Sequence, residues 1–84
     1  MAKKPPSEQF ESHRKVVALN VLRLRRGLEW SQEQLAEQAD IDRTTLARLE
    51  TRYINITLDT LFALAEVLGV SAHELLMESD EDEP

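Results

Sequence analysis

With 84 residues and no cysteine, the chain has room for one small domain that cannot rely on disulfide bonds or thiolate-bound zinc. No apolar run reaches the roughly 20 residues that span a bilayer, and the N-terminus lacks the apolar stretch of a signal peptide, so we expect a cytoplasmic protein. The net charge of −6 comes mainly from five acidic residues after Met77, which leaves a nearly neutral remainder with clustered basic residues. This distribution permits a local positive face, which nucleic-acid binding requires.

The first predicted element is a long helix that follows a polar arm. Ser7 can cap this helix, and Glu8 lies in its first turn, where the helix dipole favours an acidic residue. Apolar residues recur at helical spacing as far as about Arg26. These residues are Phe10, Val17, Val21 and Leu24.

Two shorter helices are predicted in the middle of the chain, separated by a tight turn. Ser31 caps the first, Gln32 to Ala39, and Gln34 is placed to complete a capping box. Asp42 caps the second, which runs to about Glu50.

A loop and two more helices complete the predicted pattern. After the loop, Thr51 to Thr57, a fourth helix ends at Gly69, a residue suited to a left-handed C-cap. Ser71 then begins a short fifth helix that runs to about Met77. The apolar stripe of the fourth helix consists of Leu58, Leu61, Leu64, Ala65 and Leu68.

The chain is therefore predicted to be one all-α domain, residues 7–77, between two polar ends. Residues 1–6 form a flexible basic arm that is either solvated or reaches along a bound DNA. Residues 78–84 form an acidic tail, predicted to be disordered because it has no apolar surface to bury. The tail is either plain solvated charge or a competitor of DNA for the basic face.

The segment Gln32 to Leu49 has the apolar pattern of two helices that cross steeply through a tight turn. Ala36 is small enough to let the helices approach, and Ile41 fills the corner between them. Arg43 and Thr44 lie in the first turn of the second helix of this pair. In helix-turn-helix proteins that part of the recognition helix reaches base edges in the major groove.

Further short motifs occur in a fixed order over about residues 17–77. They are Asn20-Val21 with Leu24-Arg25, Ser31 to Ala36, Leu49-Glu50, Asn55, Thr57 to Leu61, Leu64-Ala65, Leu68 to Ser71, and Glu74-Leu75. Together they resemble the Xre/Cro-type helix-turn-helix regulators, which include lambda-type repressors. The resemblance implies a compact, five-helix, lambda-repressor-like fold that binds a short palindromic operator in double-stranded DNA as a homodimer. Asp42-Arg43-Thr44 is similar to restriction–modification controller proteins, which implies an autoregulatory controller or a phage-type repressor.

The resemblance also implies which residues touch DNA. Gln32 would bind a phosphate and brace the recognition helix. Residues in the loop after that helix would contact the sugar-phosphate backbone of the DNA. The full predicted set is Gln32, Arg43, Thr44, Thr45, Arg48, Arg52, Tyr53 and Asn55.

Several of these residues keep a second interpretation. The guanidinium of Arg43 matches the two acceptors of guanine, a contact worth roughly 1–3 kcal/mol of discrimination, although a phosphate contact or a solvated charge stays open. Thr44 is open between a base contact and plain helix surface, and Tyr53 between packing and a phosphate hydrogen bond. Arg48 lies further along the helix, which favours a phosphate.

The resemblance implies two structural contacts as well. Arg25 and Glu50 would form an internal ion pair between the first and third helices. The fifth helix would contribute to a two-fold dimer through Leu75, Leu76 and Met77. Trp30 is predicted to pack at the corner between the first and second helices.

The sequence departs from the family pattern at three positions where glycine is usual. They are the helix-turn-helix corner, the residue before Trp30, and the loop after the third helix, occupied here by Asp40, Glu29 and Arg52. Aspartate tolerates the left-handed conformation better than most residues.

Other classes of protein find less support. No nucleophile elbow or glycine-rich phosphate loop is present, so an enzyme is not expected. His13 and His73 are far apart and lack paired ligands, so neither a metal nor a cofactor is expected. The alternative is an antitoxin or protein-interaction module with the same fold, whose protein partner is unknown.

Overall fold

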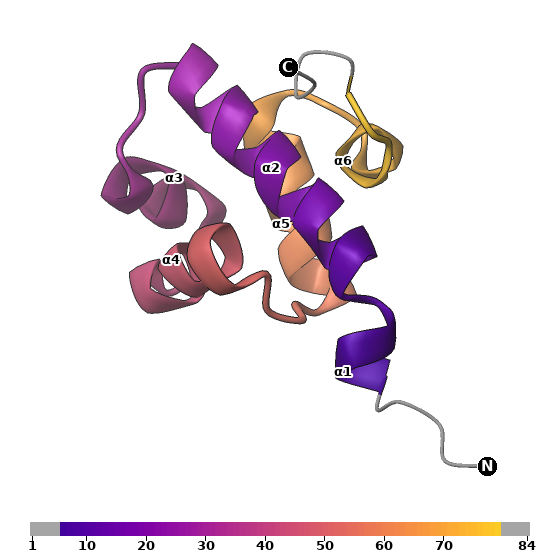
Figure 1. Cartoon of the computed structure of the whole chain (residues 1–84). Helices are drawn as coiled ribbons and strands as arrows, with labels where there is room; N and C mark the ends of the chain where they lie inside the picture. Colours follow the sequence, from indigo (N-terminus) through magenta and orange to yellow (C-terminus); the bar gives the residue numbers. More distant parts are fainter. Residues whose placement is uncertain (1–5, 80–84) are drawn as a thin grey trace, which may run out of the picture.

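The computed structural model describes residues 6–79, and over that range its regular secondary structure is entirely helical (Figure 1). They are α1 (Pro6–Gln9), α2 (Glu11–Gly27), α3 (Gln32–Ala39), α4 (Arg43–Arg52), α5 (Leu58–Leu68) and α6 (Ala72–Leu76). Helices α2 to α6 confirm the predicted five-helix fold, and α1 is a separate four-residue segment before them. The predicted arm and acidic tail lie mostly outside the described residues. None of the described helices is long and apolar enough to cross a membrane.

The helix starts follow the predicted capping residues from α3 onward. The Ser31 hydroxyl accepts from the Gln34 amide nitrogen at 3.0 Å, and the Gln34 side chain accepts from the Ser31 amide at 2.8 Å. Thr57 caps α5 by accepting from Thr60 N at 3.0 Å, and Ser71 forms the second predicted capping box. These bonds satisfy amide groups that the first turn of a helix leaves without partners.

The predicted continuous first helix is wrong at Phe10. Ser7 lies inside α1 and not before it, and the backbone breaks at Phe10, where φ is −112° and ψ is 16°. Phe10 is 46% exposed, whereas burial in α2 begins only at Val17. The apolar spacing therefore continues beyond the end of the core, and helical packing cannot hold the chain in one straight helix there.

The core lies between helices α2 to α6. Helix α2 packs against α4, α5 and α6, and α3 packs against α4 and α5 (Figure 1). The buried apolar side chains are Val17, Ala18, Val21, Leu35, Ala36, Ala39, Leu46, Leu49, Leu61, Leu64, Ala65, Leu68 and Leu75. Trp30 and Ile41 are partly buried against this cluster, as predicted for the two corners.

Among residues 6–79, three residues with side chains adopt the left-handed conformation. Glu29 has a φ of 59° and Asp40 a φ of 54°, so two of the three family glycine positions keep the backbone of glycine. At the third position the left-handed residue is Tyr53, with a φ of 54°, and not Arg52. Helix α4 therefore includes Arg52, two residues beyond the predicted end.

Candidate nucleic-acid interface

The outer face of α4 carries a polar groove. Its volume is about 320 Å³. The groove is lined by Arg43, Thr44, Ala47, Arg48, Thr51 and Arg52. These positions recur at helical spacing on one side of α4, while Leu46, Leu49 and Glu50 on the other side are buried. One helix thus presents three guanidinium groups outward because its opposite face is held in the core.

The first turn of α4 is exposed and held by a side-chain cap. The Asp42 carboxylate accepts from the Thr44 amide nitrogen at 3.2 Å and fixes the first turn. Arg43 and Thr44 follow directly, and both side chains are exposed. Thr45, which is also predicted to contact DNA, is partly buried beside them.

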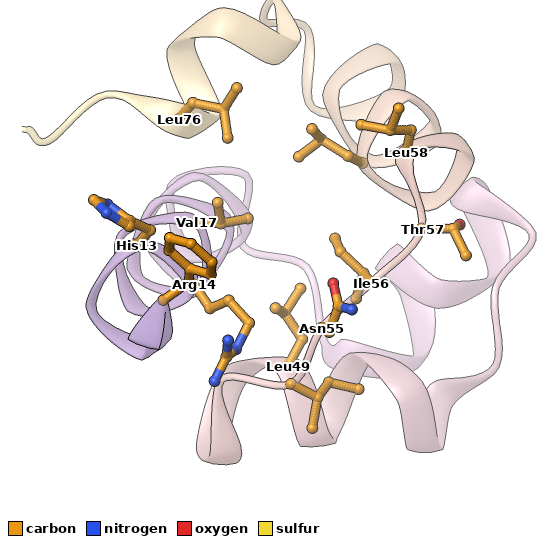
Figure 2. A pocket seen from close by; sticks show the side chains of 12 residues that line it. His13, Arg14, Val17, Leu49, Asn55, Ile56, Thr57, Leu58 and Leu76 are labelled. Carbon is orange, nitrogen blue, oxygen red and sulfur yellow. The ribbon is translucent and has the colours of Figure 1, made fainter. Parts of the chain in front are cut away.

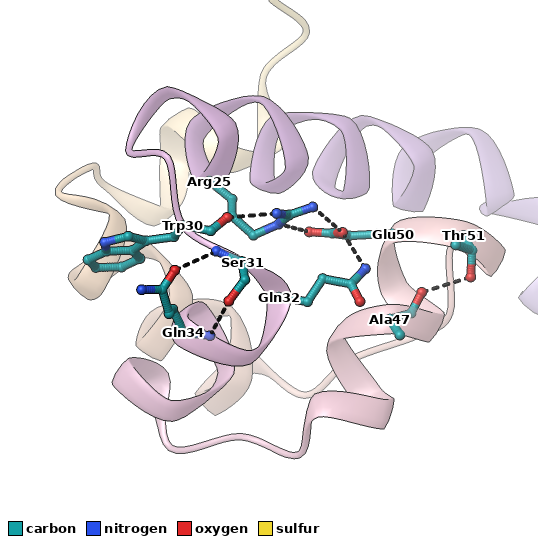
Figure 3. Close-up of polar contacts among 8 residues, drawn as sticks. All are labelled: Arg25, Trp30, Ser31, Gln32, Gln34, Ala47, Glu50 and Thr51. Carbon is teal, nitrogen blue, oxygen red and sulfur yellow. Dashed lines mark hydrogen bonds and ion pairs between the residues drawn. The ribbon is translucent and has the colours of Figure 1, made fainter.

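The predicted ion pair between Arg25 and Glu50 is confirmed (Figure 3). It joins α2 to the buried side of α4. Arg25 Nε donates to Glu50 Oε2 at 2.9 Å, and Arg25 Nη2 donates to Oε1 at 3.0 Å. The two side chains are only 12% and 3% exposed. Arg25 Nη1 also donates to the Trp30 carbonyl at 2.8 Å, so the guanidinium joins α2, the α2–α3 turn and α4.

Gln32, the first residue of α3, contributes to the same network. Its Nε2 donates to Glu50 Oε1 at 2.8 Å (Figure 3). The predicted bracing contact between α3 and the recognition helix is therefore present. Both oxygens of the buried Glu50 carboxylate are satisfied by neighbouring donors, as a buried charge requires.

Two residues of α2 contact Tyr53 at the end of α4, and these contacts were not predicted from the sequence. Arg14 Nε donates to the Tyr53 carbonyl at 2.6 Å, and Lys15 Nζ lies 5.8 Å from the centre of the Tyr53 ring. Arg52 and Asn55, predicted to contact the DNA backbone, are exposed on either side of Tyr53. No local sequence pattern signals these contacts, because they join positions almost 40 residues apart.

The predicted dimer surface on α6 needs one correction. Leu75 is 0% exposed and belongs to the core, so it cannot contact a second subunit. The turn of α6 directs Leu75 inward, whereas Leu76 and Met77 are exposed. Leu58 and Phe62 of α5 are also exposed and were not predicted to take part in such a surface.

An apolar groove lies beside Leu76. It has a volume of about 210 Å³, and Figure 2 shows Val17, Leu58 and Leu76 directed toward it from three different helices. Phe10 and Leu61 also line it. The exposed apolar surface of α5 and α6 therefore continues to the start of α2.

Comparison with known proteins agrees with this geometry. The helix-turn-helix family model HTH_3 matches residues 21–75, which include α3, the turn and α4. This chain belongs to the helix-turn-helix family. It is an Xre-like DNA-binding domain.

Two curated relatives are transcription or control proteins. A hypothetical transcription factor of Neisseria meningitidis is 40% identical over 76 residues, covering 90% of this chain and 70% of its own length. Control protein C.SmaI of Serratia marcescens is 39% identical over 67 residues, covering 80% of each chain.

Three solved structures share the fold of this helix-turn-helix domain. The Neisseria transcription factor has a TM-score of 0.78 and 37% identity, with 96% of this chain and 89% of that chain covered. The restriction–modification controller C.AhdI of Aeromonas hydrophila has a TM-score of 0.71 and 26% identity, with coverage of 76% and 97%. The biofilm master regulator SinR in complex with DNA has a TM-score of 0.69 and 27% identity, with coverage of 73% and 98%.

Proposed function

We propose that this protein is a sequence-specific transcription regulator that binds a short palindromic operator in double-stranded DNA as a homodimer. The observation that carries the proposal is the outer face of α4, where exposed Arg43 and Thr44 open a groove that continues to Arg52. The similarity to SinR, whose structure was determined in complex with DNA, supports DNA binding by this fold. The proposal places the protein in the cytoplasm, with the DNA.

The roles within this face follow from position and chemistry. Arg43 and Thr44 at the N-terminal turn of α4 read base edges, and the guanidinium of Arg43 pairs with the two acceptors of a guanine. Thr45 lies beside them. Arg48 and Arg52 lie further along α4 and bind phosphates, together with Asn55.

Gln32 is suited to a phosphate contact as well as to its bracing role. Its Nε2 uses one hydrogen toward Glu50, and the second hydrogen is available for a phosphate oxygen. Its backbone amide also lies in the first turn of α3, where helix amides lack intrahelical partners and favour an anion.

Dimerisation supplies the specificity that one helix cannot. A single recognition helix reads few base pairs, whereas two helices related by a two-fold axis read half-sites about 34 Å apart. We propose that the exposed apolar residues Leu58, Phe62, Leu76 and Met77 form the dimer surface. An isologous contact of this kind matches a palindromic operator.

Autoregulation is proposed from the similarity to two control proteins. C.SmaI is a control protein, and C.AhdI is a restriction–modification controller. By analogy with these relatives, the protein binds upstream of its own gene as a repressor or controller.

The test is fluorescence anisotropy with DNA from upstream of the protein's own gene and with a scrambled duplex. The wild type should prefer the upstream DNA, and Arg43→Ala should remove that preference. Arg26→Ala is the matched control, because Arg26 is exposed at the end of α2 and does not line the α4 groove. Equal, weak binding of all promoters tested would overturn the proposal and turn attention to a protein partner, sought by pull-down.

A further inference from the structure

One basic side chain close to the α4 face belongs to a different helix. Lys15 of α2 is exposed, and its Nζ lies 5.8 Å from the centre of the Tyr53 ring. An ammonium group is attracted to the face of an aromatic ring at this distance. Within residues 6–79, no carboxylate pairs with Lys15. The ring therefore attracts a charge that has no anionic partner in the described part of the protein.

The backbone beneath the ring is held in an unusual conformation. Tyr53 is the C-cap of α4 with φ 54° and ψ 46°, a left-handed conformation that disfavours residues with a Cβ atom. Arg14 Nε donates to its carbonyl at 2.6 Å and so binds a main-chain oxygen at the negative end of the helix dipole. Glycine would adopt this backbone with less strain, but glycine would provide no ring for Lys15. Strain that is retained by surrounding contacts is typical of functional sites.

Lys15 places a positive charge beside Tyr53, the residue that ends α4. Arg52 lines the outer groove of α4 and directly precedes Tyr53 in the chain. Arg14 and Lys15 approach Tyr53 from α2, which packs against α4. The basic surface therefore extends from the end of α4 onto a second helix.

We infer that Lys15, positioned by the Tyr53 ring, contacts the phosphodiester backbone and that α2 is part of the DNA interface. This inference rests on the proposed DNA binding and adds one phosphate contact per subunit to it. The contact is independent of base sequence, because a lysine ammonium acts on phosphate as a point charge.

The test measures Kd over a salt series for Lys15→Met, Lys15→Arg and Tyr53→Leu, with the upstream duplex and the scrambled duplex. Lys15→Met should weaken binding to both duplexes by about the same factor. It should also reduce the slope of log K against log salt by about 0.9 for each phosphate that the variant no longer neutralises. Lys15→Arg keeps the charge and should retain the wild-type slope. Tyr53→Leu keeps the lysine but removes the aromatic ring that positions it. It should therefore lose less affinity than Lys15→Met.

The possible outcomes separate this inference from the proposed function. Unchanged affinity and slope in Lys15→Met would overturn the inference while leaving a wild-type preference for the upstream duplex intact. Loss of that preference in Lys15→Met, with an unchanged slope, would also overturn it, because a phosphate contact does not read sequence. If the wild type has no preference but Lys15→Met lowers the slope on the scrambled duplex, the contact stands and the operator-reading proposal fails. Thermal melting followed by circular dichroism verifies that each variant remains folded.

Discussion

Asn20 Nδ2 donates to the main-chain oxygen of Met77 at 2.7 Å, although 57 positions separate the two residues. The same nitrogen lies 3.0 Å from the carbonyl oxygen of Leu75. Asn20 is fully buried in α2, so a side-chain amide satisfies carbonyls that the short helix α6 leaves without helical partners. One buried donor therefore holds the last helix against the first long helix.

Replacement of this donor should destabilise the domain. Asn20→Asp keeps the size of the side chain but directs a buried carboxylate at the carbonyls of Leu75 and Met77. We expect a loss of more than about 3 kcal/mol in the free energy of unfolding, since an unpaired buried polar group costs roughly 1–3 kcal/mol and a charged one costs more. Urea unfolding followed by circular dichroism measures the loss. The control Gln38→Glu makes the same chemical change on the exposed face of α3 and should stay within about 0.5 kcal/mol of wild type.

The buried ion pair predicts a non-additive result. Glu50→Ala leaves the Arg25 guanidinium without its carboxylate in a largely buried site and should cost about 3–5 kcal/mol of stability. The double variant Arg25→Met with Glu50→Leu replaces the pair by apolar groups and should lose less stability than the sum of the losses of Arg25→Met and Glu50→Leu measured singly. Additive losses in chemical denaturation would contradict a direct coupling.

Substitutions at two left-handed residues, Asp40 and Gly69, should change the stability of the protein in opposite directions. Asp40→Gly should stabilise the protein by up to about 1 kcal/mol, because glycine adopts the left-handed region without the cost of a Cβ atom. Gly69→Ala should destabilise it by roughly 1 kcal/mol. A Cβ atom at Gly69 would meet no atom within 4 Å, so backbone strain alone accounts for that loss. Differential scanning calorimetry should give a higher Tm for the first variant and a lower one for the second.

The neighbouring leucines of α6 should separate folding from assembly. Leu75→Ala removes a fully buried side chain and should cost about 2–5 kcal/mol of stability. Leu76→Ser changes an exposed side chain, so its unfolding as a monomer should stay close to wild type while dimerisation weakens. Sedimentation equilibrium measures the assembly. A fully dimeric Leu76→Ser protein would place the dimer surface elsewhere.

Features that depend on nearby residues were predictable from the sequence. The caps at Ser31, Asp42, Thr57 and Ser71 are local patterns, and the structure uses all four. Leu61, Leu64, Ala65 and Leu68 of the predicted apolar stripe of α5 are buried, because helical periodicity determines which side chains share a side. Leu58, also predicted as part of that stripe, is 68% exposed at the start of the helix.

Features that depend on packing between distant segments could not be predicted from the sequence. Phe10 has the spacing of a core residue but lies beyond the core, so periodicity alone extended the first helix too far. Leu75 and Leu76 are chemically identical, and only the placement of α6 against α2 decides which one is buried. The approach of Lys15 to Tyr53 likewise arises only after α2 and α4 have packed.

The hydrogen-bonded link from Gln32 through Glu50 to Arg25 has a consequence for association kinetics. It fixes the orientation of α3 relative to α4 within the folded chain, before a ligand is present. The conformational entropy of aligning the two helices is therefore lost during folding and not at the moment of encounter. A ligand of α3 and α4 therefore binds to a surface that is already rigid. The association rate then depends on the relative orientation and charge of the two partners and not on a slow internal rearrangement of the protein.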